Sequence, residues 1–267
     1  MSQFRIFCSV AGASFRRQLA FRFDVVMSVI ASVARVLFAY LIWSAVFDGR
    51  QQVGGFTFPE LFNYYVIASA LTQTDLSGGV ARELSDRIRG GTFSRFMLLP
   101  VSTRRYFAAD SLGASGFYAV AALAGGAAWA LLFRVPFRLT GNPLLLLQAA
   151  LMAAMGLVVM IQFNYFLGIL SFRFLDIGFF LILKDNLMAF ATGTLVPLLF
   201  LPDWLVMGMR LLPFYYVTYL PSMLAVGKCA EEAWTGLAVL AGWMLFFTAL
   251  NRLTYERLRV RYDGVGV

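Results

Sequence analysis

Long hydrophobic stretches alternate with short charged, proline-containing or glycine-containing segments along the whole chain. Six of these stretches are long enough to cross the hydrocarbon core of a bilayer, which takes roughly 20 mostly apolar residues per helix. They cover approximately residues 25–47, 58–79, 107–133, 143–171, 177–201 and 233–250. The pattern predicts an all-α, polytopic membrane protein whose six transmembrane helices form a single transmembrane domain over residues 1–267.

The composition supports a membrane location. Of the 267 residues, 60% are hydrophobic and 13% are charged, and the mean hydropathy is +0.76. An ordinary soluble domain is about 45–50% apolar and about 25% charged. A water-soluble globule of this size could not bury so much apolar surface, so the missing solvent is a bilayer.

Several kinds of chemistry are excluded by residue counts. Histidine is absent, which excludes catalytic triads, histidine-ligated zinc or haem, and imidazole proton relays. The only lysines, Lys184 and Lys228, lie outside any G-x-x-x-x-G-K-[ST] motif, so the chain has no P-loop for ATP hydrolysis. The two cysteines, Cys8 and Cys229, are too few and too distant in sequence for a metal site or a disulfide scaffold. We expect no catalytic residue, metal ligand or cofactor on this chain.

The distribution of basic residues predicts the topology. Most of the 22 lysine and arginine residues fall in the N-terminal segment, the second loop between predicted spans and the C-terminal tail. Cytoplasmic segments of membrane proteins carry this excess, so we expect both termini in the cytoplasm. The net charge of +8 is explained by this topology and does not indicate nucleic-acid binding.

Residues 2–22 are predicted to form an interfacial amphipathic helix before the first span. Such a helix lies among the lipid headgroups, with its aromatic side chains in the bilayer and its arginines on lipid phosphates. The alternative is a basic flank that only sets topology. The apolar positions, at helical spacing, are Phe4, Phe7, Cys8, Ala11, Phe15 and Leu19, and the polar positions are Arg5, Ser9, Gly12 and Arg16.

The second loop contains a predicted polar helix with one apolar stripe, formed by Val80, Leu84 and Ile88. Two pairs of opposite charge stand at i,i+4 spacing, Arg82 with Asp86 and Glu83 with Arg87. Gly90-Gly91 then supplies a left-handed residue that ends the helix.

An apolar run at 92–100, which something must cover, follows this helix. A charged and apolar projection on a chain without an ATPase motif indicates docking to a partner. An ordinary solvated loop is the alternative.

The order of an amphipathic helix, two spans, and then Ile88–Gly91 (IRGG) and Phe96–Ser102 (FMLLPVS) resembles the membrane subunits of type-2 ATP-binding-cassette exporters. The closest likeness is to their compact bacterial six-span permeases. In that family an isoleucine precedes a glycine by two or three residues, and a Leu-Leu-x-Pro or Leu-Leu-Pro run leads into the third span. The resemblance covers nearly the whole chain as topology and about residues 80–102 as a motif.

The resemblance implies that residues 81–102 form a coupling segment seated in a cleft of a separate ATPase subunit, which binds ATP and Mg²⁺. It also implies a second permease half, identical or homologous to this chain, and a place in the bacterial inner membrane. The candidate coupling residues are Arg82, Glu83, Asp86, Arg87, Ile88, Arg89, Gly91, Leu98, Leu99 and Pro100.

Residues 202–230, between the last two predicted spans, combine prolines with aromatic residues. Prolines break helices and aromatic residues favour the membrane interface, so one or two short helices are expected to dip into the outer leaflet. This arrangement resembles the extracellular re-entrant hairpin that precedes the last span of type-2 exporter permeases. The alternative is a seventh pass over 204–226, which Arg210, Pro213 and Pro221 disfavour.

Four charged residues are candidates for an intramembrane pathway or ion pair: Arg35, Asp75, Lys184 and Asp185. A charge near the bilayer centre is costly unless it is paired, hydrated or able to reach the interface, so these groups should face the protein interior. Arg35 could pair with Asp185 or Asp75, or Arg35 and Lys184 could contact an anionic headgroup of a substrate.

The predicted function is that of an exporter permease that moves its substrate by alternating access, powered by a separate ATPase. An ATP-independent secondary transporter or channel is the alternative, with Arg35, Lys184 and Asp185 carrying the ion or substrate chemistry. A membrane-embedded enzyme is disfavoured, because no cluster of acids, histidine or serine–base pair is present. A structural or lipid-organising role is a further possibility.

Overall fold

The computed structural model describes residues 3–133, 139–174, 176–192, 198 and 201–261. Across these residues the chain is helical, and the only β pairing is an isolated bridge between Val53 and Phe56. The predicted all-α class is therefore confirmed. The longer helices are α1 (Gln3–Ala20), α2 (Arg22–Val46), α3 (Phe58–Thr74), α4 (Gly78–Arg89), α6 (Thr103–Phe133), α7 (Pro143–Ile169), α8 (Gly178–Ala191) and α11 (Ala233–Leu258).

Shorter elements connect these helices. They are α5 (Ser94–Met97), α9 (Asp203–Met209), a π-helical segment (Tyr215–Tyr219) that runs into α10 (Leu220–Val226), and the 3-10 turns Leu170–Phe172, Ala230–Glu232 and Arg259–Arg261.

Three described helical segments are long and apolar enough to cross a membrane: Val25–Val46, Pro143–Phe172 and Ala230–Leu258. They coincide with three of the six predicted stretches, which supports a multi-pass membrane protein. The other stretches, 58–79, 107–133 and 177–201, overlap α3, α6 and α8, and α6 begins four residues before its stretch, at Thr103. Residues 193–197 and 199–200 lie outside the described part, so six spans stay a prediction.

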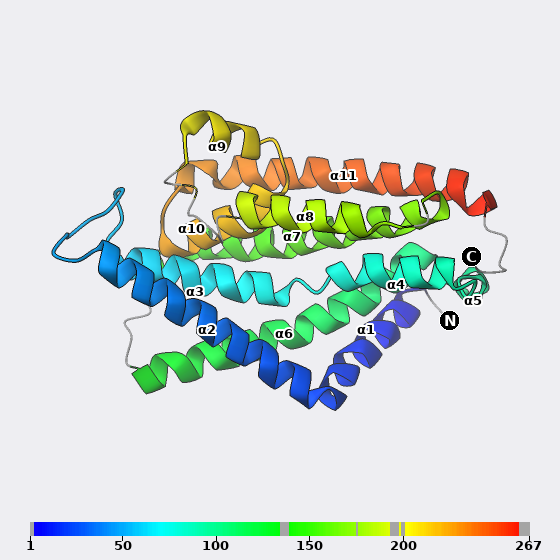
Figure 1. Cartoon of the computed structure of the whole chain (residues 1–267), viewed down its shortest axis with the longest axis horizontal. Helices are drawn as coiled ribbons and strands as arrows, with labels where there is room; N and C mark the ends of the chain where they lie inside the picture. The colour runs from blue at the N-terminus through cyan, green and yellow to red at the C-terminus, as the bar shows by residue number, and fades with distance from the viewer. Residues whose placement is uncertain (1–2, 134–138, 175, 193–197, 199–200, 262–267) are drawn as a thin grey trace.

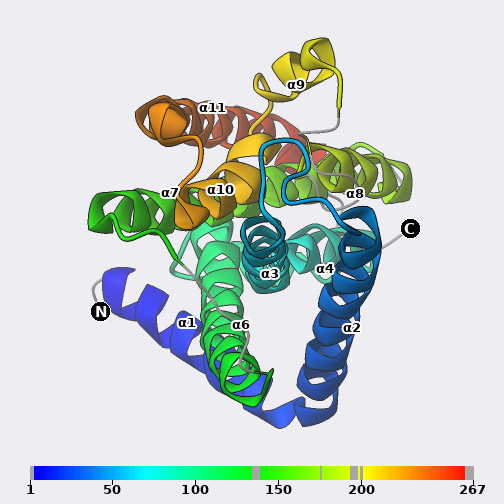
Figure 2. The ribbon, with the colours of Figure 1, turned by 90° about the vertical axis from the view of Figure 1, so that its left-hand side faces the viewer.

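The long helices lie beside one another in an elongated bundle, with α7 and α11 side by side along its length (Figure 1). In the end view, α3 is central and has α2, α6 and α10 around it (Figure 2). The start of α1, the end of α11, and α4 with α5 all lie at one end of the bundle, here named the α4 end (Figure 1). The α9 and α10 segments lie toward the opposite end.

Local sequence explains where two of the long helices begin. At α3, Thr57 and Glu60 form a capping box, in which the backbone N–H of Thr57 donates to Glu60 Oε2 at 2.9 Å. At α7, the side chain of Asn142 accepts a hydrogen bond from the backbone N–H of Leu144 at 3.0 Å. A proline in the first turn of each helix places its missing N–H where no intrahelical partner exists.

Two main hydrophobic clusters fill the described part of the bundle, and a third, small one lies between α4, α7 and the start of α8. The larger cluster joins α3, α7, α10 and α11 and buries Tyr64, Met152 and Leu220. At Gly236 of α11 an added Cβ would lie 2.7 Å from Leu220 Cδ2 and Met152 Cε, so the ends of these two side chains would have to shift. The smaller cluster lies at the α4 end and joins α4, α5, α6 and α7.

Candidate functional site

Helix α4 has one buried face and one exposed face. Its buried side chains pack on α7, and the exposed face carries Arg82, Asp86 and Arg89. The predicted apolar stripe is confirmed and is wider than three residues. The buried face consists of the apolar Val80, Ala81, Leu84 and Ile88 together with Ser85.

The close approach of α4 to α7 depends on Gly168 of α7. A Cβ added at this glycine would lie 2.8 Å from Leu84 Cβ and Cδ1 and 3.2 Å from Ala81 Cα. Any larger residue would push α4 outward. The sequence analysis did not identify Gly168, because one glycine among 23 carries no local signal of what it faces.

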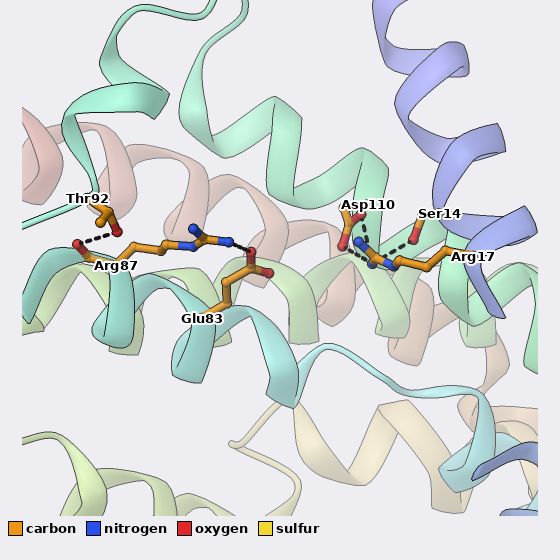
Figure 3. Close-up of polar contacts among 6 residues, drawn as sticks. All are labelled: Ser14, Arg17, Glu83, Arg87, Thr92 and Asp110. Carbon is orange, nitrogen blue, oxygen red and sulfur yellow. Dashed lines mark hydrogen bonds and ion pairs between the residues drawn. The ribbon is translucent and has the colours of Figure 1, made fainter. Parts of the chain in front are cut away.

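One of the two predicted ion pairs on α4 forms. Arg87 Nη2 lies 3.5 Å from Glu83 Oε1, with both side chains partly exposed (Figure 3). Arg82 and Asp86, which were expected to pair in the same way, are both exposed and do not form an ion pair within the described structure. An exposed ion pair of this kind contributes little to stability, because water screens the two charges and solvates each of them separately. The unpaired charges of Arg82 and Asp86 are available to another molecule.

The predicted helix stop at Gly90-Gly91 is confirmed in detail. Gly91 has φ +67°, and its N–H donates to the carbonyl of Ile88 at 3.2 Å. The N–H of Thr92 donates to the carbonyl of Arg87 at 3.0 Å, and the Thr92 hydroxyl reaches the same oxygen at 3.4 Å (Figure 3). This is the Schellman arrangement, which requires a left-handed residue at Gly91.

The apolar run after α4 is covered in part. Phe93 and Phe96 are buried against Phe107 of α6, and the Arg87 guanidinium lies 5.7 Å from the centre of the Phe96 ring. Leu98, by contrast, is 86% exposed, and Leu99 and Pro100 are exposed beside it. The predicted docking element is therefore a fixed helix followed by an uncovered apolar edge.

Helix α1 packs along α6. Arg17 Nη2 binds both carboxylate oxygens of Asp110, at 3.0 and 2.9 Å, and donates to Ser14 Oγ at 3.2 Å (Figure 3). A Cβ at Gly113 would lie 2.1 Å from the carbonyl oxygen of Ala11, so the two backbones touch. Within the predicted segment 2–22 a helix forms over Gln3–Ala20, with its apolar positions divided between α6 and the outside, and its interfacial location stays a prediction.

Tyr106 stands between the α1–α6 contact and α4. Its ring lies 5.3 Å from that of Phe96, and burial raises the pKa of its hydroxyl, as do the carboxylates of Asp110 and Glu83. Tyr106 therefore lies within electrostatic reach of charges on α4 and at the α1–α6 contact.

Three of the four candidate intramembrane charges have partners within the described part of the chain. Lys184 is buried and binds Asp185 of its own helix at 2.8 Å. Asp75 ends α3 and accepts hydrogen bonds from Ser77. The side chain of Arg35 lies outside the described residues, and its pairing stays a prediction.

Two uncharged residues that the sequence analysis missed join these charges. Asn164 of α7 donates to Ser77 Oγ at 2.8 Å and accepts from Lys184 Nζ at 3.2 Å. A polar residue inside the apolar stretch 143–171 is the signal that could have found Asn164.

The segment before α11 is broken into short helices, as predicted, and a continuous helix over 204–226 does not form. Arg210, at the end of α9, binds Glu232 Oε1 at 2.7 Å, and the Tyr215 hydroxyl donates to Glu232 Oε2 at 2.9 Å. These contacts tie α9 to the turn before α11. Cys229, Glu231 and Glu232 also lie within 4.8 Å of one another, but Glu232 is already engaged and exposed acidic groups are common without an ion.

Comparison with known proteins gives one match. A family model described as ABC-2 family transporter protein matches residues 33–266, which is most of the chain. The matched region contains α4, α5 and every residue of the candidate site except those on α1. Among curated proteins and solved structures, none matches.

Proposed function

Because the chain belongs to the ABC-2 transporter family, as a permease subunit of a type-2 ATP-binding-cassette transporter, we propose that it moves a substrate out of the cell by alternating access. A separate ATPase subunit supplies the energy, and ATP and Mg²⁺ bind there. A second permease half, identical or homologous, completes the path.

The proposed topology has six spans in a bacterial inner membrane, with both termini in the cytoplasm. Six long segments, α2, α3, α6, α7, α8 and α11, support it by following one another back and forth along the bundle (Figure 1). The start of α1 and the last turns of α11 lie at the α4 end (Figure 1). The arginines of α4, of α5 and of the last turns of α11 are concentrated there. The positive-inside rule assigns this end to the cytoplasm. The α9–α10 segment, residues 202–230, is then extracellular and re-entrant.

The observation that carries the proposal is the two-faced structure of α4. Its inner face is fixed to α7 through Leu84 and Gly168, and its outer face presents the charges of Arg82, Asp86 and Arg89. A rigid helix transmits a push as a rigid-body displacement, whereas a flexible loop would absorb it. The ATPase therefore acts on the outer face of α4 and on the exposed edge Leu98–Pro100.

In this mechanism the chain performs no chemistry. Closure of the ATPase subunits on ATP displaces α4, and α4 displaces α7, so the populations of inward-open and outward-open states shift. Lys184 and Asp185 lie on α8, next to this contact between α4 and α7. The alternative of an ATP-independent transporter or channel is weakened because Lys184, Asp185 and Asp75 are occupied by bonds within the chain.

The proposal is tested by reversing exposed charges on α4. We expect the double variant Asp86→Arg, Arg89→Glu to lose most of its ATP-binding-cassette ATPase during affinity purification, although its insertion and thermal stability stay unchanged. Both side chains are exposed, so the fold does not depend on them. Arg257→Glu, an exposed reversal on α11 at the same end, is the matched control and should keep the ATPase.

Mass spectrometry of the purified complexes gives the stoichiometry. Equal ATPase retention by the double variant and the Arg257→Glu control would refute α4 as the docking element. If the unmodified chain purifies without any P-loop protein, the exporter proposal itself fails and the secondary transporter is favoured.

A further inference from the structure

We propose that the break between α3 and α4 is a polar joint, held at one angle by a directional chain of hydrogen bonds through Asn164 and Ser77. These two residues would be positioning residues that fix α4 relative to α7 and α8. The inference rests on the proposed function in one respect, namely that α4 receives the push of an ATPase. The geometry of the joint is independent of that partner.

The joint is a short interruption in an otherwise continuous rod. Helix α3 ends at Thr74, helix α4 begins at Gly78, and the two helices follow each other nearly in line (Figure 1). Asp75, at the end of α3, has ψ 89°, which is not helical. The backbone N–H of Ser77 donates to Asp75 Oδ1 at 3.0 Å, in the turn that aspartate typically forms two residues ahead. A break of this kind concentrates any bending of the rod at three residues.

The hydrogen bonds across the joint all run in the same direction. Lys184 Nζ donates to Asn164 Oδ1 at 3.2 Å, and Asn164 Nδ2 donates to Ser77 Oγ at 2.8 Å. The hydroxyl of Ser77 donates in turn to Asp75 Oδ1. The chain therefore leads from an ammonium to a carboxylate through two neutral side chains, and each bond polarises the next in the favourable sense.

The orientation of the Asn164 amide is fixed by its partners, and its NH₂ group also donates to the Met160 carbonyl at 3.0 Å. A reversed amide would place its NH₂ group against the Lys184 ammonium, which has no acceptor. Ser77 and Asn164 are both fully buried, and Lys184 is 8% exposed. Ser77 and Asn164 have no exposed surface, so water does not readily replace the bond between them, and the chain favours one arrangement of the joint.

Each helix around the joint contributes to it. Asn164 comes from α7 and Lys184 from α8, and on α6 the Ser115 hydroxyl accepts the N–H of Leu76 at 3.5 Å. A displacement of α4 that changes the joint angle must therefore break bonds to three other helices or carry those helices along. If the other helices move together with α4, a push on α4 is transmitted to the bundle.

Two variants break the chain at different points. Ser77→Ala removes one hydroxyl and adds no volume, and Asn164→Leu removes both the donor and the acceptor at a similar side-chain volume. The matched control is Ser111→Ala on α6. Ser111 is also buried, but its hydroxyl has no hydrogen-bond partner among the described residues, so its removal should change nothing.

The first measurement uses the chain without a partner. In a cysteine-free background (Cys8→Ser, Cys229→Ser), spin labels at Asp86 of α4 and Leu253 of α11 report the distance between α4 and the α7–α11 pair. Losing one buried hydrogen bond lowers the equilibrium constant for the native joint angle, relative to other angles, by about five-fold, equivalent to about 1 kcal/mol. We expect a single narrow distance in the unmodified chain and in Ser111→Ala, and a broadened distribution in Ser77→Ala and Asn164→Leu.

The second measurement uses the purified complex with its ATPase. We expect Ser77→Ala to retain the ATPase but to reduce the stimulation of ATP hydrolysis by the permease about five-fold. Unchanged distance distributions in Ser77→Ala overturn the joint, even if Asn164→Leu fails to fold. Broadened distances with normal stimulation overturn the positioning role. If the unmodified chain binds no ATPase, the proposed function fails, and the distance measurement alone decides the joint.

Discussion

Replacing Gly168 of α7 by alanine tests how closely the candidate coupling helix must pack. The added Cβ would lie 2.8 Å from Leu84 Cβ, whereas ordinary contact begins at 3.4 Å. Leu84 Cβ is attached directly to the backbone, so a rotamer change cannot relieve the clash, and α4 must move by about 0.6 Å. Overpacking of this kind costs about 1–3 kcal/mol. Alanine also favours the helix over glycine by about 1 kcal/mol, which offsets part of that cost.

Gly242→Ala in α11 isolates the packing cost, because a Cβ at this exposed glycine meets nothing within 4 Å. Both variants gain the helix propensity of alanine, and only Gly168→Ala has the clash. We expect the apparent unfolding midpoint of Gly168→Ala, in the same detergent, to lie about 2–10 °C below that of Gly242→Ala. Equal midpoints would show that α4 yields freely at this contact and would refute a rigid α4–α7 unit.

Two further predictions concern α1 and the α10–α11 turn. Gly113→Ala should detach α1 from α6 and increase the proteolysis of α1, because the new Cβ meets the Ala11 carbonyl oxygen at 2.1 Å, whereas Gly116→Ala, with its nearest atom at 4.0 Å, should not. Equal proteolysis of the two variants would contradict the docked position of α1. Burial, together with the Glu232 and Glu231 carboxylates, raises the pKa of the Cys229 thiol to about 11. Because the thiolate is the reactive form, maleimide labelling of a Cys8→Ser protein should be slow at neutral pH and rise about tenfold per pH unit up to about pH 10. A rate that levels off below pH 9 would contradict this environment.

Local features of the chain were predictable because each depends on neighbouring residues. The apolar stretches determined the helical class, since a backbone in a bilayer must satisfy its own hydrogen bonds. The stripe of Val80, Leu84 and Ile88 and the glycine at 91 determined α4 and its end. The run at 96–102 pointed to the transporter family that the family model then matched.

Contacts between distant segments were decided only by the tertiary structure. No local pattern distinguishes Gly113 and Gly168, whose absent side chains admit α1 and α4, from glycines that face lipid. The partners of Lys184, which are Asp185 and Asn164, were not predicted, because helical spacing gives the face of a residue but not the element that packs on it. Asn164 of α7, far from residues 75–77 in sequence, completes the joint only when the bundle brings these segments together. Burial and close approach depend on two segments at once. The sequence of one segment determines the face that it will bury, but not which other segment packs against that face.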